Sequence, residues 1–286
     1  MCIICSNDYN KSLTSLNCSG CNNIEKIPDI LVNLTHLFCD NCPNLKSIPP
    51  TLVNLTYLCF AGSINIIEIP DTLINLSKLY CSYTKIEKIP STLTKLNILS
   101  CILTNIDFIP DTLINLNMLY CYNTYITHLP DTLVNLTKLH CFNTGIKIIP
   151  NTFIKLAELY CFNTNIKILP YTLVNLNKLY CFKTKITNIP ETLINLVELH
   201  CYNTKIDKIS NKLLNLENLY CNESLIMDDP FFIIKKLKKN KHSIIKFQKL
   251  YKNYKLFKTL WKIAEYYTRV KYSPENLIKN DLISFD

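Results

Sequence analysis

The chain is built on a repeat of about twenty residues, and this repeat constrains the fold more than any other feature. Each copy reads roughly L-x-x-L-x-C-x-x-T-x-I-x-x-I-P-x-T-L-x-N. The same frame extends towards the N-terminus through Phe60, Cys39 and Cys18 at intervals of twenty-one residues. Eleven copies therefore cover the sequence from about Leu13 to Ser224. The cysteines that recur at intervals of twenty are Cys81, Cys101, Cys121, Cys141, Cys161, Cys181, Cys201 and Cys221.

Each copy predicts a short strand around its L-x-C triplet. The leucine and the cysteine point to one face of such a strand, and the residue between them points to the other. One coil of twenty residues cannot bury its leucines alone, so neighbouring coils must stack. We therefore expect an inward column of cysteines that pack as small apolar side chains. The following threonine can hydrogen-bond the turn backbone, and the proline of the Ile-Pro pair excludes a helix there.

This pattern resembles the leucine-rich repeat family, whose signature is L-x-x-L-x-L-x-x-[N/C]-x-L. Here cysteine replaces the third strand leucine, and threonine replaces asparagine in most copies. The short repeat and the Ile-Pro pair are most similar to the shortest subclass, found in bacterial effectors and in large DNA viruses of protists, so a viral protein is one possibility. The resemblance implies an α/β-type horseshoe solenoid of about eleven coils, with short parallel strands and extended or 3-10 convex segments. We expect an N-terminal cap at residues 1–12, the solenoid at 13–226 and a basic helical tail at 227–286.

Outward strand positions decide what a solenoid can bind, because its curvature creates an extended concave surface. In this chain they form two aromatic columns, one just before and one just after the cysteine. Cross-strand stacking alone could account for the aromatic residues. We favour a second interpretation, in which a long exposed aromatic strip marks a site for a protein partner. The candidate binding residues are Tyr80, Tyr120, Tyr122, His140, Phe142, Tyr160, Phe162, Tyr180, Phe182, His200 and Tyr202.

The charges beside these columns alternate in sign, which argues against a purely anionic ligand along the array. They are Lys78, Lys138, Glu158, Lys178 and Glu198.

Motifs typical of enzymes are missing from the sequence: there is no glycine-rich phosphate loop, nucleophile elbow or His–Cys catalytic pairing. Cys18-x-x-Cys21 and Cys39-x-x-Cys42 have the spacing of a zinc site, but the repeat frame already explains all four positions. We assign Cys2 and Cys5 to the N-terminal cap. The sequence therefore predicts a protein that is not an enzyme and has no metal, cofactor or small-molecule substrate.

The location that we expect is intracellular and cytoplasmic. The first residues show no secretion signal, and no window of the sequence is apolar enough to span a membrane. Fifteen cysteines without a signal are typical of reduced thiols in a reducing compartment.

The tail carries all of the excess positive charge. Residues 231–286 hold 14 Lys and Arg against 4 Asp and Glu, a net charge of +10, whereas the remaining chain has a net charge of −1. Apolar residues recur there at helical spacing and lysines recur every three residues. The stretch "FQKLYKNYKLFKTL" resembles a degenerate calmodulin-binding IQ motif. The residues that could bind a partner are Lys246, Phe247, Gln248, Lys249, Lys252, Lys255, Lys258 and Trp261.

Two functions follow from these patterns. The first is a scaffold that binds a protein partner on its concave face, with the tail as a terminal cap whose lysines are solvated. The alternative is an adaptor whose basic amphipathic helix binds a calmodulin-like protein, an anionic membrane or RNA, because such helices suit all three.

Overall fold

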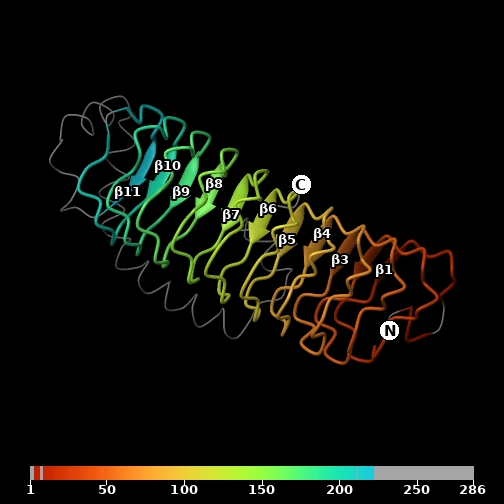
Figure 1. The fold of residues 1–286 in the computed structure, drawn as a ribbon. Coiled ribbons are helices and arrows are strands. Elements are labelled where there is room, and N and C mark those ends of the chain that lie inside the picture. Colours follow the sequence, from red (N-terminus) through yellow and green to blue (C-terminus); the bar gives the residue numbers. More distant parts are fainter. Residues whose placement is uncertain (1–2, 7–8, 211, 222–286) are drawn as a thin grey trace. The chain divides into compact units, whose positions relative to one another are not determined.

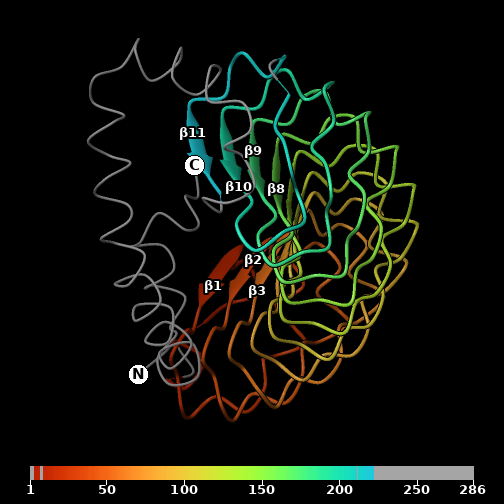
Figure 2. The ribbon, with the colours of Figure 1, turned by 90° about the vertical axis from the view of Figure 1, so that its left-hand side faces the viewer.

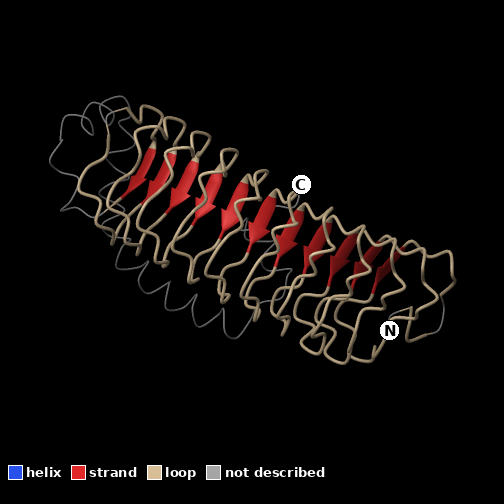
Figure 3. Cartoon of the chain, viewed as in Figure 1, coloured by secondary structure: helices blue, strands red, loops and turns tan. Residues whose placement is uncertain are grey.

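The repeat folds into a single parallel sheet of eleven strands. A computed structural model describes residues 3–6, 9–210 and 212–221 of the chain, which belong to a first compact unit, Met1–Ile226. The second unit, Met227–Asp286, lies outside the described residues, and so do the tail residues singled out above. The strands follow one another in chain order, from orange to cyan in Figure 1 and as red arrows in Figure 3. They are β1 (Ser15–Asn17), β2 (His36–Phe38), β3 (Tyr57–Cys59), β4 (Lys78–Tyr80), β5 (Ile98–Ser100), β6 (Met118–Tyr120), β7 (Lys138–His140), β8 (Glu158–Tyr160), β9 (Lys178–Tyr180), β10 (Glu198–His200) and β11 (Asn218–Tyr220).

The register places equivalent residues of neighbouring coils side by side. In the pairing of β7 with β8, for example, Leu139 lies opposite Leu159 and His140 lies opposite Tyr160. Figure 2 shows the consequence for this unit: the strands line one side of the stack and the loops form the other. The predicted eleven coils are confirmed. Residues at the same position of successive repeats lie next to one another and form a column across the sheet.

The core lies between the strands and the loops. The leucines at the centres of the strands, such as Leu119 and Leu159, are completely buried, and so are the isoleucines after the turn, such as Ile146. Each coil contributes the same set of apolar side chains to the next. The stack therefore has one continuous core, which is how repeat proteins obtain their stability.

The cysteine column points into this core, as predicted. Cys81, Cys101, Cys121, Cys141, Cys161 and Cys181 are all 0% exposed, and the described cysteines are reduced. Burial raises the pKa of these thiols, to about 12 for Cys101 and Cys161, because a thiolate would lose its hydration. The column therefore serves as core packing with the thiols protonated at neutral pH.

Polar side chains close the coils and join them. In the coils from Cys81 to Cys201, the threonine three residues after the inward cysteine donates to the cysteine carbonyl, as Thr164 Oγ1 does to Cys161 O over 2.6 Å. Thr132 and Asn135 instead bond to the preceding coil, at 2.6 Å to Asp111 O and 2.9 Å to Ile114 O. Each coil thus satisfies backbone carbonyls that the turns of the preceding coil leave open.

The loop side consists of extended segments and isolated turns. We expected extended or 3-10 segments there, but the described part of the chain contains no 3-10 helix. Between β6 and β7, Leu133 N donates to Pro130 O and Leu136 N donates to Leu133 O. These i to i+3 bonds follow one another without overlapping, whereas a 3-10 helix needs them on consecutive residues.

The core thiols should make the solenoid sensitive to alkali. A buried thiol with a raised pKa contributes stability that is complete below the unfolded pKa, near 9, and is lost as the pH rises towards the folded value of about 12. We predict that Cys161→Ala, although less stable at pH 7, makes the decline of the unfolding free energy above pH 9 shallower by about 1.4 kcal/mol per pH unit. Urea unfolding at pH 7, 9.5 and 10.5 measures this slope. Equal slopes in both proteins would show that Cys161 ionises freely in the native state.

Candidate binding face

Two columns of outward side chains lie next to the buried cysteines on the strand-lined side. The first column is the last residue of each strand, such as Tyr160 in β8, and the second comes two residues later, such as Phe162. Since Cys161 between them points inward, both neighbours point outward. Every candidate residue predicted on the concave face belongs to one of these two columns.

The rings of the second column are stacked from coil to coil. Tyr122 and Phe142 have ring centroids 4.0 Å apart, Phe142 and Phe162 4.2 Å, Phe162 and Phe182 4.3 Å, and Phe182 and Tyr202 4.4 Å. All four pairs have interplanar angles of 15° or less. Five coils in succession therefore carry one continuous stack of rings, which we call the outer ladder.

The first column forms a second stack, the inner ladder. Tyr160 and Tyr180 are 4.2 Å apart, Tyr180 and His200 3.9 Å, and His200 and Tyr220 4.0 Å, all within 18° of parallel. Towards the N-terminus the geometry changes: the Tyr120 and His140 rings meet edge to face, at 85°. Parallel stacking in this column thus belongs to the coils of β8 to β11.

Stacking leaves the strip less exposed than the sequence suggested. Tyr80, Tyr120, Phe162 and Phe182 are only 5–7% exposed, and the remaining candidate residues are half-buried. The expectation of a freely exposed strip is wrong in this respect. Strands in a sheet lie about 4.8 Å apart, which places equivalent rings on neighbouring strands side by side. The stacked rings therefore cover one another's faces.

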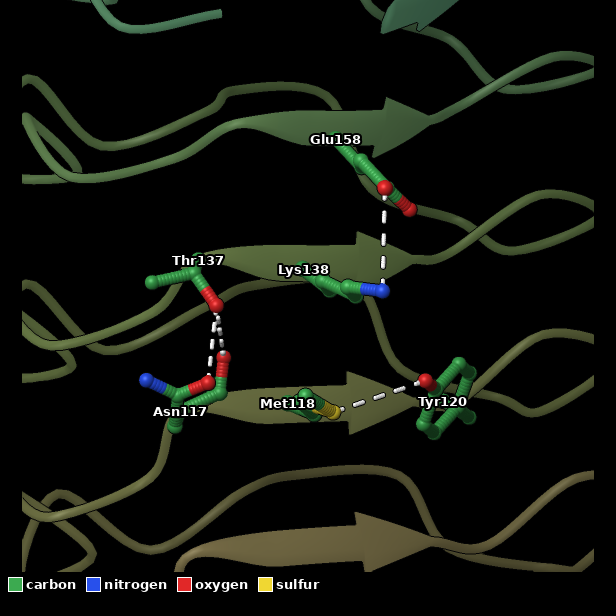
Figure 4. A network of polar contacts seen from close by, with 6 residues as sticks. All are labelled: Asn117, Met118, Tyr120, Thr137, Lys138 and Glu158. Carbon is green, nitrogen blue, oxygen red and sulfur yellow. Dashed lines mark hydrogen bonds and ion pairs between the residues drawn. The ribbon is translucent and has the colours of Figure 1, made fainter. Parts of the chain in front are cut away.

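Charged groups beside the ladders are paired with one another. Lys138 and Glu158 approach to 3.6 Å across β7 and β8, as Figure 4 shows together with the bond from the Tyr120 hydroxyl to Met118 and the contacts of Asn117 with Thr137. Glu198 accepts from the Tyr180 hydroxyl at 2.6 Å and lies 2.9 Å from His200 Nε2. Its pKa is lowered by these contacts in spite of its partial burial. The face therefore carries charges of both signs.

Among the described residues, His140 is the one residue with a buried side-chain nitrogen or oxygen atom that has no hydrogen-bond partner. Its Nε2 is shielded from solvent and has no hydrogen-bond partner. Burial, together with the nearby charge of Lys138, lowers the pKa of His140 to about 3. His200 has its pKa lowered as well, but Glu198 opposes that shift. The sequence placed both histidines in one outward column, whereas in the structure His200 Nε2 contacts Glu198 and His140 Nε2 is shielded and has no hydrogen-bond partner.

The N-terminal end of the face is different, and the sequence did not reveal its arrangement. Cys59 and Asp40 replace aromatic residues there, and the Cys59 thiol lies 2.6 Å from Asp40 Oδ1. Burial raises the pKa of Asp40, although bonds from Ser19 and the Ala61 N–H oppose the shift. The ring of Tyr57 contacts those of Phe38 and Tyr80, at 4.8 and 5.4 Å. The two parts of the face are separated by a buried pair of serines, Ser82 and Ser100, whose hydroxyls are 2.9 Å apart.

Other kinds of site find little support in the described residues. No three His, Cys, Asp or Glu side chains in residues 3–6, 9–210 and 212–221 come together as metal ligands. Nor does this part of the chain form a helix of the length and apolar character that a membrane crossing needs. An open groove of about 640 Å³ runs beside the first strands, but the side chains of Asn33, Thr35, Asn54, Thr56 and Asn75 already donate to backbone carbonyls. It is lined by Ser12, Thr14, Asn33, Thr35, Asn54, Thr56, Asn75 and Lys95.

Comparison with known proteins supports the fold. The model of the family described as Leucine Rich Repeat matches residues 12–34. No curated protein matches the chain in sequence. Among solved structures, the functional domain of InlJ from Listeria monocytogenes, which includes a cysteine ladder, superposes with a TM-score of 0.66 at 24% identity. That match covers 74% of this chain and 54% of InlJ, so the chain spans about half of that structure.

Two further structures show the same architecture. The leucine-rich effector YopM from Yersinia pestis has a TM-score of 0.61 at 19% identity, covering 78% of this chain and 68% of YopM. The ectodomain of the receptor kinase GASSHO1/SCHENGEN3 from Arabidopsis thaliana, in complex with CASPARIAN STRIP INTEGRITY FACTOR 2, has a TM-score of 0.59 at 21% identity, covering 76% of this chain and 32% of the ectodomain. The chain thus has the fold of a leucine-rich repeat solenoid with repeats of about twenty residues.

The shielded ring nitrogen of His140 should make the solenoid sensitive to acid. A histidine whose folded pKa is depressed contributes stability that is present above the unfolded pKa, near 6.5, and is lost as the pH falls towards 3. We predict that His140→Phe, which keeps a ring in the stack, reduces the stability lost between pH 7 and pH 5 by up to about 2 kcal/mol. Urea unfolding at the two pH values measures the difference. The exposed His128 provides a control: His128→Gln should behave as the wild type, and a His140→Phe protein that does so too would contradict the burial of His140.

Proposed function

We propose that the chain is a non-enzymatic scaffold that binds a protein partner on its strand-lined face, across the coils of β6 to β10. The observation that carries this proposal is the pair of aromatic ladders. They present a continuous row of ring edges and hydroxyls over several coils, flanked by charges of both signs. Aromatic residues are enriched at protein interfaces.

The accessibility of the rings favours a protein over a single-stranded nucleic acid. Proteins that bind single strands offer open ring faces on which bases stack, together with a positively charged groove. Here the faces inside each ladder are covered by neighbouring rings at 3.9–4.4 Å. The lysines beside them are matched by Glu158 and Glu198. Both features disfavour a polyanion along this face.

A protein partner can contact the edges of the stacked rings. Ring edges carry partial positive charge and attract carbonyl oxygens, the faces of other aromatic rings and the sulfur of methionine. The tyrosine hydroxyls add polar groups along the same rows, and that of Tyr180 already donates to Glu198. Because stacking already fixes the rings, they lose little conformational freedom on binding, and this lowers the entropic cost of association.

Known structures support a polypeptide ligand for such a solenoid. The receptor kinase ectodomain compared above was solved in complex with CASPARIAN STRIP INTEGRITY FACTOR 2. Another receptor kinase from Arabidopsis, HAESA, was solved in complex with the peptide hormone IDA and the co-receptor SERK1, and it has a TM-score of 0.56 to this chain. We further propose an intracellular location, which rests on the many reduced thiols of the core.

Affinity capture with matched charge variants tests the proposed face. Lys178 lies beside the ladders, whereas Lys167 is exposed on the loop side, so Lys178→Glu and Lys167→Glu make the same change of charge on opposite sides. We predict that proteins captured from a lysate by the wild type are retained by Lys167→Glu and lost, at least tenfold, with Lys178→Glu. A second variant, Tyr160→Phe/Tyr180→Phe, removes two hydroxyls while keeping the stack and should weaken the same captured species.

Circular dichroism confirms that each variant is folded. Equal capture by both charge variants would contradict binding on the strand-lined face. If capture is instead lost only when residues 227–286 are deleted, the function belongs to the basic tail, and the adaptor hypothesis replaces this one.

A further inference from the structure

Two cysteines at the N-terminal end of the solenoid lie in contact. Cys5 Sγ and Cys21 Sγ are 3.5 Å apart, although sixteen positions separate them in sequence. Cys5 belongs to the turn at residues 3–6. Cys21 follows the turn after β1, and its backbone N–H donates to Cys18 O. The chain therefore brings one thiol of the N-terminal segment against one thiol of the first coil.

This pair differs from the core thiols in its access to solvent. Cys5 and Cys21 are both partly exposed, whereas the cysteine column from Cys39 to Cys181 is completely buried. Burial keeps reagents away from the column thiols. It also raises their pKa, so that little thiolate is present to react. Cys42, which occupies the position of Cys21 one coil further on, is also 0% exposed. The first coil thus presents a partly exposed thiol at a position that is buried in the next coil.

We propose that Cys5 and Cys21 form a reversible redox site, a dithiol that a small disulfide such as oxidised glutathione converts to an intramolecular disulfide. One of the two thiolates attacks a sulfur of glutathione disulfide and releases one glutathione. The other protein thiolate then attacks the mixed disulfide and releases the second. The protein gives up two protons and two electrons, and one glutathione disulfide becomes two glutathione thiols. Reduction by excess thiol runs the same steps backwards.

The disulfide would fasten the N-terminal segment to the end of the sheet. β1 is an edge strand that pairs only with β2, so the first coil lacks the support that inner coils receive from both sides. Repeat proteins need a cap at such an end. A covalent link between Cys5 and Cys21 closes a short loop and restricts the freedom of the unfolded segment. The proposal is independent of the binding face, which lies on later coils.

Peptide mapping after oxidation tests the site. The full-length protein is treated with oxidised glutathione under native conditions, remaining thiols are alkylated, and tryptic peptides are analysed by mass spectrometry. Cleavage after Lys11 and Lys26 leaves Cys5 on a peptide with Cys2, and Cys21 on a peptide with Cys18. We expect these two peptides to become disulfide-linked, with fragmentation placing the bond at Cys5 and Cys21, and we expect dithiothreitol to reverse it.

Single cysteine-to-serine variants show whether the disulfide forms at Cys5 and Cys21 or at neighbouring cysteines. Cys2→Ser and Cys42→Ser should still form the link, whereas Cys5→Ser should abolish it and leave Cys21 open to alkylation. Hydrogen exchange at β1 should slow on oxidation of the wild type and stay unchanged in Cys5→Ser. A link that persists in Cys5→Ser, a bond at Cys18, or full alkylation of both thiols after oxidation would each overturn the proposal.

Discussion

The stacking of one coil on the next is the constraint on which the rest of this structure depends. A coil of about twenty residues has too little volume to bury its own leucines, so each coil completes its core with its neighbours. The parallel strands fix the register of that contact, as the pairing of Leu139 with Leu159 illustrates. Once the register is fixed, a residue type that recurs every twenty positions must form a column. The cysteines form an inward column that is shielded from water, and the threonines and asparagines form columns that donate to backbone carbonyls.

The same constraint shapes the binding face. Aromatic residues at one strand position come within about 4 Å of one another, a distance at which parallel rings attract. The ladders thereby acquire a fixed surface of ring edges and lose the open faces that a base would need. The charges follow the same rule, because Lys138 faces Glu158 on the next strand. The face is thus rigid, mixed in charge and extended along the stack, which suits a folded or extended polypeptide.

Much of this could be predicted from sequence, because the period carries the information. The number of coils, the inward direction of Cys161 and the bond from Thr164 to the turn all follow from the repeat frame and strand alternation. The exposure of Phe162 could not be predicted in the same way, since it depends on the side-chain conformation and on the distance between neighbouring strands. The burial of His140 Nε2 and the contact of Cys5 with Cys21 also escaped prediction. The first depends on how neighbouring rings pack, and the second involves Cys5, which lies outside the repeat frame.

The central claim is that the repeat sorts side chains into an inward thiol column and an outward aromatic column. Native alkylation with iodoacetamide, followed by mass spectrometry of each cysteine over time, tests it most directly under reducing conditions. The account predicts that Cys101, Cys141 and Cys181 stay unmodified until a denaturant is added, while Cys5 and Cys21 react in the native protein. Alkylation of the column thiols at the rate seen in the unfolded chain would contradict the inward assignment and, with it, the outward direction of the rings.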